Sequence, residues 1–513
     1  MYYLNYFKNL SLIYVTILLI FIILSKISFI LTGFVLEDSF ILFRSTFNFA
    51  DYGIFSYNLD ESYSATTSKA YGLLCAFFRK IFNEYAILSI IILNSILSFF
   101  SSLFIFKSVQ SLFSLKQKIL SKNDILFLII ILFLNPSILI IGIVGLEFSI
   151  LVFFITLVLL GVINDNKIYI SFVFFIPLIR IELIGFVLIL SFFYLYFLRW
   201  KNFKTTLSLG ILGFILNLYL NNLFDNSFFP GTAISKWNAL SASGDFSFIK
   251  ILKNLNYWFF NERSFFLGVY SKYIPNFIYT LTGTAVLIYA LNNFKYLFFN
   301  KFRDININEK IFITTISSSI IFLPLAYIIS GHIWDWYLYK YSFLSYTLFA
   351  IFLLNIKNFG KIRNLIIIGI IFISVFQFLV LKNIGNQENS YRSLVGKDIY
   401  KLSTNKNKDT LFLEPSGYIP YFAKIKTFDT EGLVSPKIFE YRNRINKRWW
   451  LDFIEENKPT FIVDRKNIFK GFSQDGKYNL NDDEIIWFKK NYDLIQKYNY
   501  HEFINKDSSI FKS

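Results

Sequence analysis

The chain has 513 residues, of which 55% are hydrophobic and 17% charged, and its mean hydropathy is +0.49. These values exclude a soluble globular protein and indicate a polytopic membrane protein. The net charge of +17 does not point to nucleic acid, because excess Lys and Arg in a membrane protein usually mark cytoplasmic loops. With one cysteine, Cys75, and two histidines, His332 and His501, the sequence provides no intrachain disulfide and no Cys-rich metal site. Any chemistry must therefore rest on carboxylates, Arg and Lys.

Long apolar runs follow one another from the N-terminus. A helix needs about 20 apolar residues to cross a bilayer. The first run, from Leu10 to about Leu36, predicts an uncleaved span, because it is too long for a signal-peptide core and no small-residue cleavage site follows. The single spans that we predict are 11–33, 85–106, 125–142, 146–163, 204–222, 276–294, 311–330, 341–356 and 364–382.

The apolar segment 168–198 is too long for a single span and carries Pro177, Arg180 and Glu182 near its middle. Charged or irregular segments persist at membrane depth only where protein or water surrounds them. We therefore predict two short helices that meet at these charges, which brings the total to about eleven crossings.

The distribution of charge predicts the orientation. If the N-terminus is cytoplasmic, the inner loops carry most of the Lys and Arg, as the positive-inside rule requires. The unusual polar clusters then share the outer face, where a site is expected. They are 37–84, the turn 145–147, the break at 180–182, the loop 223–275 and everything after 382.

The composition becomes polar after about residue 390. Short β-like runs at 410–414, 424–430 and 460–464 alternate with a helix-like stretch at 448–457. This pattern predicts a membrane domain over 1–385 and a small extracytoplasmic α/β domain over 386–513.

The stretch after the first span, "EDSFILFR", contains Glu37, Asp38 and Arg44. Its apolar periodicity predicts a short amphipathic helix that lies at the outer surface of the membrane that the chain spans. In a structural interpretation Asp38 caps the free amides at the helix start. In a functional interpretation it is a general base beside a charged substrate.

Other polar groups allow two interpretations each. Glu147 lies in a tight turn and serves either as a helix cap or as a site carboxylate. Arg180 and Glu182 form either a structural ion pair or the lining of a polar cavity. Lys236 either extends toward the interface or meets a phosphate. Lys26, inside the first span, either extends toward the interface or faces the same cavity. The stretch 331–341, "GHIWDWYLYKY", is mostly typical of an aromatic belt, with a sugar-stacking surface as the alternative.

Taken in order, several stretches resemble the bacterial GT-C-fold glycosyltransferases that use polyprenyl-phosphate-linked sugars, in particular those similar to the mycobacterial terminal arabinofuranosyltransferase. The matching stretches span residues 37 to 436. They are "EDSFILFRSTFNFADYGIFSYN" (37–58), "ESYSATTSKAYG" (61–72), "GLEFSIL" (145–151), "PLIRIELIG" (177–185), "FFPGTAISK" (228–236) and "DTEGLVSP" (429–436).

The resemblance implies a GT-C-like all-α membrane bundle in a bacterial inner membrane, with its active site and C-terminal domain outside. It implies inverting transfer of a sugar from a polyprenyl-phosphate donor to a hydroxyl of a glycan, lipid-linked saccharide or protein. It names Asp38 as the base with Glu37 as the other choice, and places Arg44, Arg180 and Lys236 near the donor phosphate. Glu147 and Glu182 would orient these groups or bind sugar hydroxyls. No metal ligand set is expected, and a divalent cation stays open.

The sequence departs from the family pattern at several positions, which leaves the sugar and the acceptor open. Glu37 stands where Asp is common, Ile181 where Pro is common, and Gly231 where Asn is usual. The alternative functions are a transporter or flippase for lipid-linked saccharides and an enzyme similar to O-antigen ligases or polymerases. A transporter would predict inverted repeats, and the sequence shows none.

Overall fold

The computed structural model describes residues 12–234, 248–260, 283–293, 306–329, 335–356, 360–442, 448–465, 481–498 and 508–513. The chain forms two compact units. The first is drawn from Met1–Phe34, Ile87–Tyr219 and Phe246–Ile384. The second is drawn from Val35–Ala86, Leu220–Asp245 and Gly385–Ser513.

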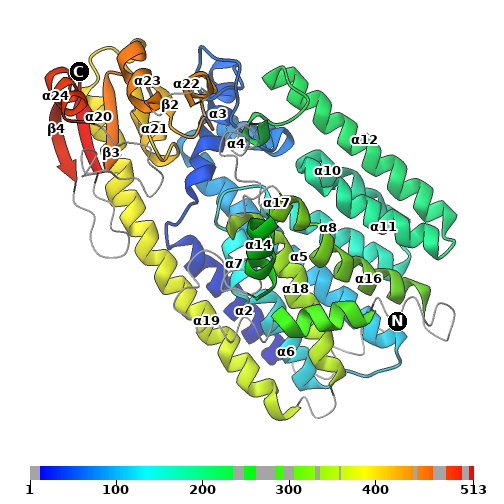
Figure 1. Ribbon diagram of the computed structural model, residues 1–513. Helices are drawn as coiled ribbons and strands as arrows, with labels where there is room; N and C mark the ends of the chain where they lie inside the picture. Colours follow the sequence, from blue (N-terminus) through cyan, green and yellow to red (C-terminus); the bar gives the residue numbers. More distant parts are fainter. Residues whose placement is uncertain are drawn as a thin grey trace. The chain divides into compact units, whose positions relative to one another are not determined.

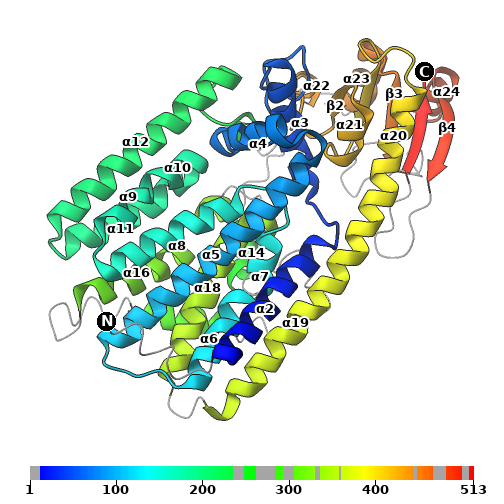
Figure 2. The ribbon, with the colours of Figure 1, turned by 180° about the vertical axis from the view of Figure 1, so that it is seen from behind.

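The first unit consists of helices, some of which continue into the second unit (Figure 1). Its helices α2 and α19 run side by side in both ribbon views (Figure 2), and the rings of Phe29 and Phe378 pack with centroids 6.0 Å apart. The helices are α2 (Leu12–Ile30), α5 (Ala86–Leu115), α6 (Lys122–Phe133), α7 (Pro136–Ile141), α8 (Phe148–Asn164), α9 (Lys167–Ser171), α10 (Phe175–Ile179), α11 (Ile184–Tyr196), α12 (Trp200–Asp225), α14 (Phe248–Phe260), α16 (Ile307–Phe322), α17 (Leu325–Ile329), α18 (Asp335–Asn355) and α19 (Gly360–Gln387).

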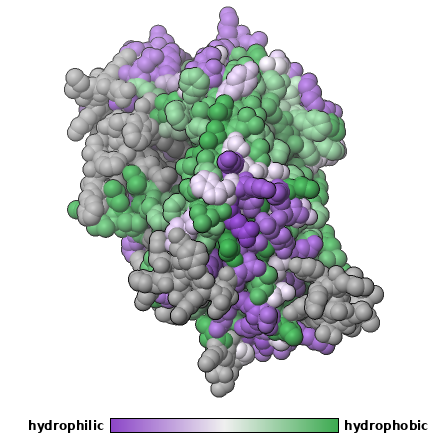
Figure 3. All heavy atoms as spheres, turned by 90° about the vertical axis from the view of Figure 1, so that its right-hand side faces the viewer, coloured by the Kyte–Doolittle hydropathy of each residue, from purple (hydrophilic) through white to green (hydrophobic). Residues whose placement is uncertain are grey.

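Exposed apolar side chains mark this unit as a membrane domain. Four continuous helical runs of the described chain are long and apolar enough to cross a membrane by length and composition: Lys69–Leu115, Trp200–Asp225, Ile307–Ile329 and Ile362–Leu402. Large hydrophobic side chains such as Leu212, Ile368 and Phe372 are more than half exposed. Figure 3 shows broad areas of hydrophobic side chains on one face, beside a group of hydrophilic ones. The total of about eleven crossings stays a prediction.

The predicted break in the segment 168–198 is confirmed. Helix α10 ends before Arg180, whose backbone is extended (φ −137°, ψ 111°), and a short 3-10 turn, η3 (Ile181–Leu183), leads into α11. A helix end leaves backbone carbonyls without partners. The side-chain amide of Asn217 on α12 donates to one of them, the Leu178 carbonyl, at 2.7 Å.

Close packing of α12 stabilises the broken segment. A Cβ atom at Gly213 would lie 2.0 Å from the carbonyl oxygen of Phe174, so only glycine allows this approach. Small residues are commonly found where membrane helices pack closely. The break is therefore supported by neighbouring protein.

The second unit begins with α3 (Glu37–Tyr52) and α4 (Lys69–Phe82). The helix predicted after the first span is confirmed by α3, and its position on the outer interface of the membrane stays a prediction. It ends at Gly53, whose φ of +76° favours glycine. One side of α3 packs on the C-terminal part of the same unit, where the rings of Phe40 and Tyr418 lie 3.9 Å apart. This unit is therefore larger than the predicted domain 386–513, because the loop after the first span belongs to it.

The C-terminal part contains a five-stranded sheet with the strand order β2-β1-β3-β5-β4. Strand β1 pairs in parallel with β2 and β3, whereas β5 pairs antiparallel with β3 and β4. The first three strands and α23 coincide with the predicted runs. The elements are η5 (Glu388–Arg392), α20 (Ser393–Leu402), β1 (Thr410–Leu413), α21 (Tyr418–Ala423), β2 (Lys426–Asp429), α22 (Ile438–Arg442), α23 (Trp449–Asn457), β3 (Phe461–Arg465), α24 (Asp482–Asn491), β4 (Asp493–Tyr498) and β5 (Ser508–Lys512).

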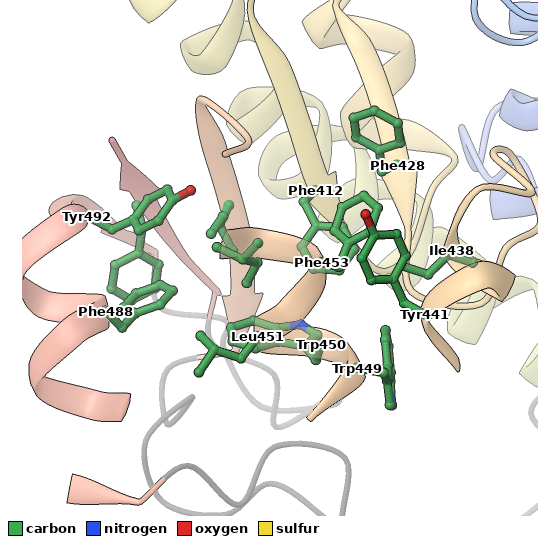
Figure 4. Packing of buried hydrophobic residues seen from close by; sticks show 13 residues of the cluster. Phe412, Phe428, Ile438, Tyr441, Trp449, Trp450, Leu451, Phe453, Phe488 and Tyr492 are labelled. Carbon is green, nitrogen blue, oxygen red and sulfur yellow. The ribbon is translucent and has the colours of Figure 1, made fainter. Parts of the chain in front are cut away.

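Helices cover both faces of this sheet. Successive residues of a strand point to opposite faces, and in β1 Phe412 joins one apolar cluster while Leu411 and Leu413 join another. Figure 4 shows the first cluster, in which Phe412 packs against Phe453 of α23 with ring centroids 4.8 Å apart. The second cluster is completed by α20 and α21. The sheet and its two apolar clusters thus form the core of the C-terminal part of this unit.

Candidate functional site

Three of the predicted site residues come together in the first unit. The Arg180 guanidinium donates to the Glu147 carboxylate at 2.6 Å and to the Glu182 carboxylate at 2.7 Å. The break between α10 and η3 places Arg180, and Glu147 lies at the start of α8. The structure thus brings these three charges together, and their roles at a site stay a prediction.

Two further residues of this cluster were not predicted as site residues. The Tyr327 hydroxyl accepts from Arg180 at 3.2 Å and donates to Glu182. The Lys340 ammonium donates to the same hydroxyl at 3.0 Å and to Glu182 at 3.2 Å. In the sequence Lys340 stands within an aromatic run, and no neighbouring residue indicates that it pairs with Glu182.

The cluster is buried and electrically balanced. Arg180, Glu147 and Lys340 are at most 5% exposed, and the two cations face two carboxylates. The Glu182 side chain is the more accessible member, at 23% exposed. Buried charges of this kind are stable only when paired. A ligand that meets Glu182 would contact a preassembled set of hydrogen-bonding groups.

The two acids at the start of α3 have different surroundings. The Glu37 carboxylate accepts from the Arg392 guanidinium at 2.6 Å and from the backbone amides of Gly417 and Tyr418 at 2.7 and 3.0 Å. Asp38 follows it in the first turn and is half-buried. Sequence alone could not separate the two acids, because the partners of Glu37 lie more than 350 residues away along the chain.

Asp38 does not occupy the N-cap position of α3 that the structural interpretation gives it. That position is Leu36, whose side chain makes no cap hydrogen bond. Asp38 instead lies one position inside the helix, where a negative charge favourably meets the positive end of the helix dipole.

Arg44 belongs to the same unit and contacts mainly backbone oxygens. Its guanidinium donates to the carbonyls of Tyr57, Pro420 and Ile425 at 3.0, 2.8 and 2.6 Å. It also lies over the Tyr57 ring, 4.4 Å from the centroid. Arg44 thus links α3 to the C-terminal part within the second unit, and we call it a connector of this unit.

A buried ion pair in the second unit was missed altogether. The Lys69 ammonium lies 2.6 Å from the Asp225 carboxylate, and each side chain is 1% exposed. Asp225 also accepts from the backbone amide of Ser64 at 3.0 Å, and Lys69 donates to the Thr66 carbonyl at 2.9 Å. Nothing near Lys69 in the sequence predicts this ion pair, because its carboxylate comes from Asp225 at the end of α12.

The stretch "DTEGLVSP" forms a closed turn at the end of β2. The Asp429 carboxylate accepts from the backbone amides of Leu433, Val434 and Ser435 at 2.8, 2.9 and 3.3 Å. Burial raises the pKa of the Asp429 carboxyl to about 6, and the three amides act in the opposite direction. Gly432 adopts a φ of +71° in this turn, which explains the glycine.

The remaining predicted residues have separate positions. Lys26 is buried in α2 and donates to the Ser98 hydroxyl at 2.6 Å. Lys236 and His332 lie outside the described residues. Among the described residues no group of three or more His, Cys, Asp and Glu could hold a metal ion, and the divalent cation stays an open prediction.

Comparison with known proteins gives a match to one family model and matches to solved structures. The family model of a domain of unknown function, DUF8728, matches residues 383–511. Comparison with curated proteins gives no match.

Solved structures match over most of the chain. ArnT from Cupriavidus metallidurans bound to undecaprenyl phosphate is 11% identical and has a TM-score of 0.51, with 96% of this chain and 97% of that chain covered. Its apo state gives 11% identity, a TM-score of 0.53 and the same coverage. An oligosaccharyltransferase of Archaeoglobus fulgidus in complex with Zn and sulfate is 10% identical, with a TM-score of 0.52 and coverage of 93% and 72%.

Both neighbours are glycosyltransferases of the GT-C type. The predicted GT-C fold is therefore confirmed at the level of the fold, and the similarity to the mycobacterial terminal arabinofuranosyltransferase stays a prediction. The fold of this chain is therefore similar to that of these two proteins over most of its length, the C-terminal part included.

Proposed function

We propose that this protein is an inverting membrane glycosyltransferase that moves a sugar from a polyprenyl-phosphate donor to a hydroxyl acceptor on the outer face of the inner membrane. The observation that carries the proposal is the GT-C likeness over 96% of the chain to a protein bound to undecaprenyl phosphate. The order of the matching motifs from residue 37 to 436 supports it independently.

Asp38 is the proposed base. A hydroxyl is a weak nucleophile at neutral pH, so a carboxylate must accept its proton as the oxygen attacks the anomeric carbon. The bond from that carbon to the phosphate oxygen breaks in the same step, and the polyprenyl phosphate leaves with the electron pair. Glu37 is the weaker choice, because Arg392 and two backbone amides already engage its carboxylate.

Arg180 and Lys236 are the proposed partners of the donor phosphate. A guanidinium stabilises the developing phosphate charge well because it offers several aligned donors. The contacts of Glu147 and Glu182 with Arg180 support an orienting role for both carboxylates. Arg44, which donates to three backbone carbonyls, is better suited to holding the fold than to binding phosphate.

The test is transfer by purified protein in lipid nanodiscs. A panel of undecaprenyl-phosphate-linked pentoses and hexoses is offered with glycan, lipid-linked saccharide and peptide acceptors, and released undecaprenyl phosphate is quantified by mass spectrometry. The wild type should consume at least one donor, and Asp38→Asn should lower kcat by about 10²- to 10⁴-fold.

Asp51→Asn is the matched control. It makes the same change on the same helix but removes only a partly exposed ion pair with Arg79, so transfer should remain. Unchanged transfer by Asp38→Asn would contradict the assignment of the base. If no donor is consumed while labelled lipid-linked saccharide crosses a vesicle membrane, the protein is a transporter and the proposal fails.

A further inference from the structure

The two adjacent acids of α3 point to different sides of the helix. Neighbouring helical residues are rotated by about 100° from each other. Glu37, Phe40 and Arg44 share the side that faces the C-terminal part, where Phe40 packs on Tyr418. Asp38 therefore points away from that side and toward the side of Ile41, which belongs to a separate buried cluster with Val434 of the C-terminal part.

The docked side is held by contacts with a short stretch of the C-terminal part. Glu37 binds the amides of 417 and 418, and Arg44 binds the carbonyls of 420 and 425. Farther along the loop, Asn58 donates to the Thr427 carbonyl and accepts from its amide, both at 2.9 Å. Three polar side chains of the loop thus engage the backbone of 417–427, which fixes the register between the two segments.

The first turn of α3 meets this stretch with no free space. A Cβ atom on Gly417 would lie 2.2 Å from the Glu37 carbonyl oxygen and 2.7 Å from its carboxylate. Arg392, which engages the Glu37 carboxylate, also lies 3.0 Å from the Glu388 carboxylate. The turn that carries Asp38 is thus held through Glu37, both by backbone amides of the C-terminal part and by the ion pairs of Arg392 with Glu37 and Glu388.

We propose that the stretch 388–427, within the domain of unknown function, serves to hold the first turn of α3, and that Glu37 is a positioning residue for Asp38. The inference rests on the proposed role of Asp38 as the base. It gives the C-terminal domain a function in the reaction: a base must be held close to its productive geometry, and a displacement of about 1 Å lowers rates by up to about 100-fold.

Removal of either partner should lower kcat rather than weaken donor binding. Glu37→Gln and Arg392→Gln should each lower kcat by about 10-fold or more and leave KM for the undecaprenyl-phosphate sugar within about two-fold. Two measurements in detergent, the thermal unfolding temperature and the elution profile in size-exclusion chromatography, identify variants that remain folded.

The pH profile separates positioning from general loss of structure. Arg392→Gln leaves the Glu37 charge unbalanced beside Asp38, so the acid limb of kcat should move to higher pH. Glu37→Gln leaves Arg392 unbalanced, so the limb should move to lower pH, each by about half a unit or more. The double variant should restore the limb to its wild-type position. Loss of rate without these opposed shifts would overturn the inference.

Gly417→Ala displaces the turn without changing any charge. It should lower kcat by about 10-fold or more and leave the acid limb in place. Gly369→Ala is the matched control, because its Cβ would meet open space. Asp60→Asn, which removes an exposed pair with Lys426 at the far end of the same contact, should leave kcat unchanged.

The outcomes distinguish the inference from the proposed function. If Asp38→Asn abolishes transfer and Glu37→Gln, Arg392→Gln and Gly417→Ala retain wild-type kcat, the proposed function holds and the inference is wrong. If Asp38→Asn retains transfer, the proposed function itself is wrong at its base, whatever the other variants do.

Discussion

The two units hold Arg180, which is buried, and Arg44, which is half-buried, in different ways. Arg180 of the first unit donates to side chains, namely Glu147, Glu182 and Tyr327. Arg44 of the second unit donates to three backbone carbonyls. Side-chain partners can rotate and exchange, whereas backbone partners are fixed by the fold. The difference indicates that the first arginine joins charged side chains of several helices, whereas the second fixes the backbone of a loop.

The largest effect is expected at Arg180. Arg180→Leu leaves Glu147 as a buried charge without its cation and should lower stability by about 3–5 kcal/mol. The measurement is thermal unfolding in detergent, with Arg180→Leu/Glu147→Leu as the control, because the double variant removes both charges and should regain part of the loss. A single variant as stable as the wild type would show that water reaches the cluster.

A smaller effect is expected at Arg44. Arg44→Leu deprives three carbonyls of their donor, and buried polar groups without partners lower stability by roughly 2–4 kcal/mol in such a case. The loss should appear as faster hydrogen exchange in 37–58 and in 418–427, with α16 of the first unit unaffected. Exchange that rises equally in both units would contradict the assignment of Arg44 as a connector of the second unit only.

The smallest effect is a pH dependence at Asp429, a carboxylate held by backbone amides. Its folded pKa of about 6 exceeds the ordinary value of 3.8, so its contribution to stability is present below pH 4 and is lost as pH rises through about 6. The loss is roughly 1–3 kcal/mol. The unfolding temperature of the wild type, minus that of Asp429→Asn, should therefore fall between pH 4.5 and 7. A constant or rising difference would contradict the raised pKa.

Local patterns predicted what depends on local physics. The charges at 180 and 182 in an apolar segment predicted a break, because a helix cannot keep them in lipid without support. The β-like runs at 410–414, 424–430 and 460–464 predicted the first three strands in chain order, because their apolar residues suit a buried sheet. The amphipathic helix from Glu37 followed from its periodicity.

Long-range pairings could not be predicted in the same way. Glu37 and Asp38 are equivalent acids until Arg392 and Gly417 are placed beside one of them. Lys340 appeared to belong to an aromatic belt, because nothing local shows that Glu182 lies 3.2 Å away. The Lys69–Asp225 pair joins segments 156 residues apart. In each case a distant segment supplies the partner, and one sequence carries no signal of that distance.

The contact between Glu37 and Arg392 also sets an order of events during synthesis. The two residues are separated by 355 positions, and nearly all of the membrane domain is translated between them. At synthesis rates of about 5–20 residues per second, the first turn of α3 waits roughly 20–70 s for its partners. The nascent chain therefore inserts its helices while the loop that carries Asp38 is still incomplete, and a chain that stops before residue 388 would leave that loop without its support.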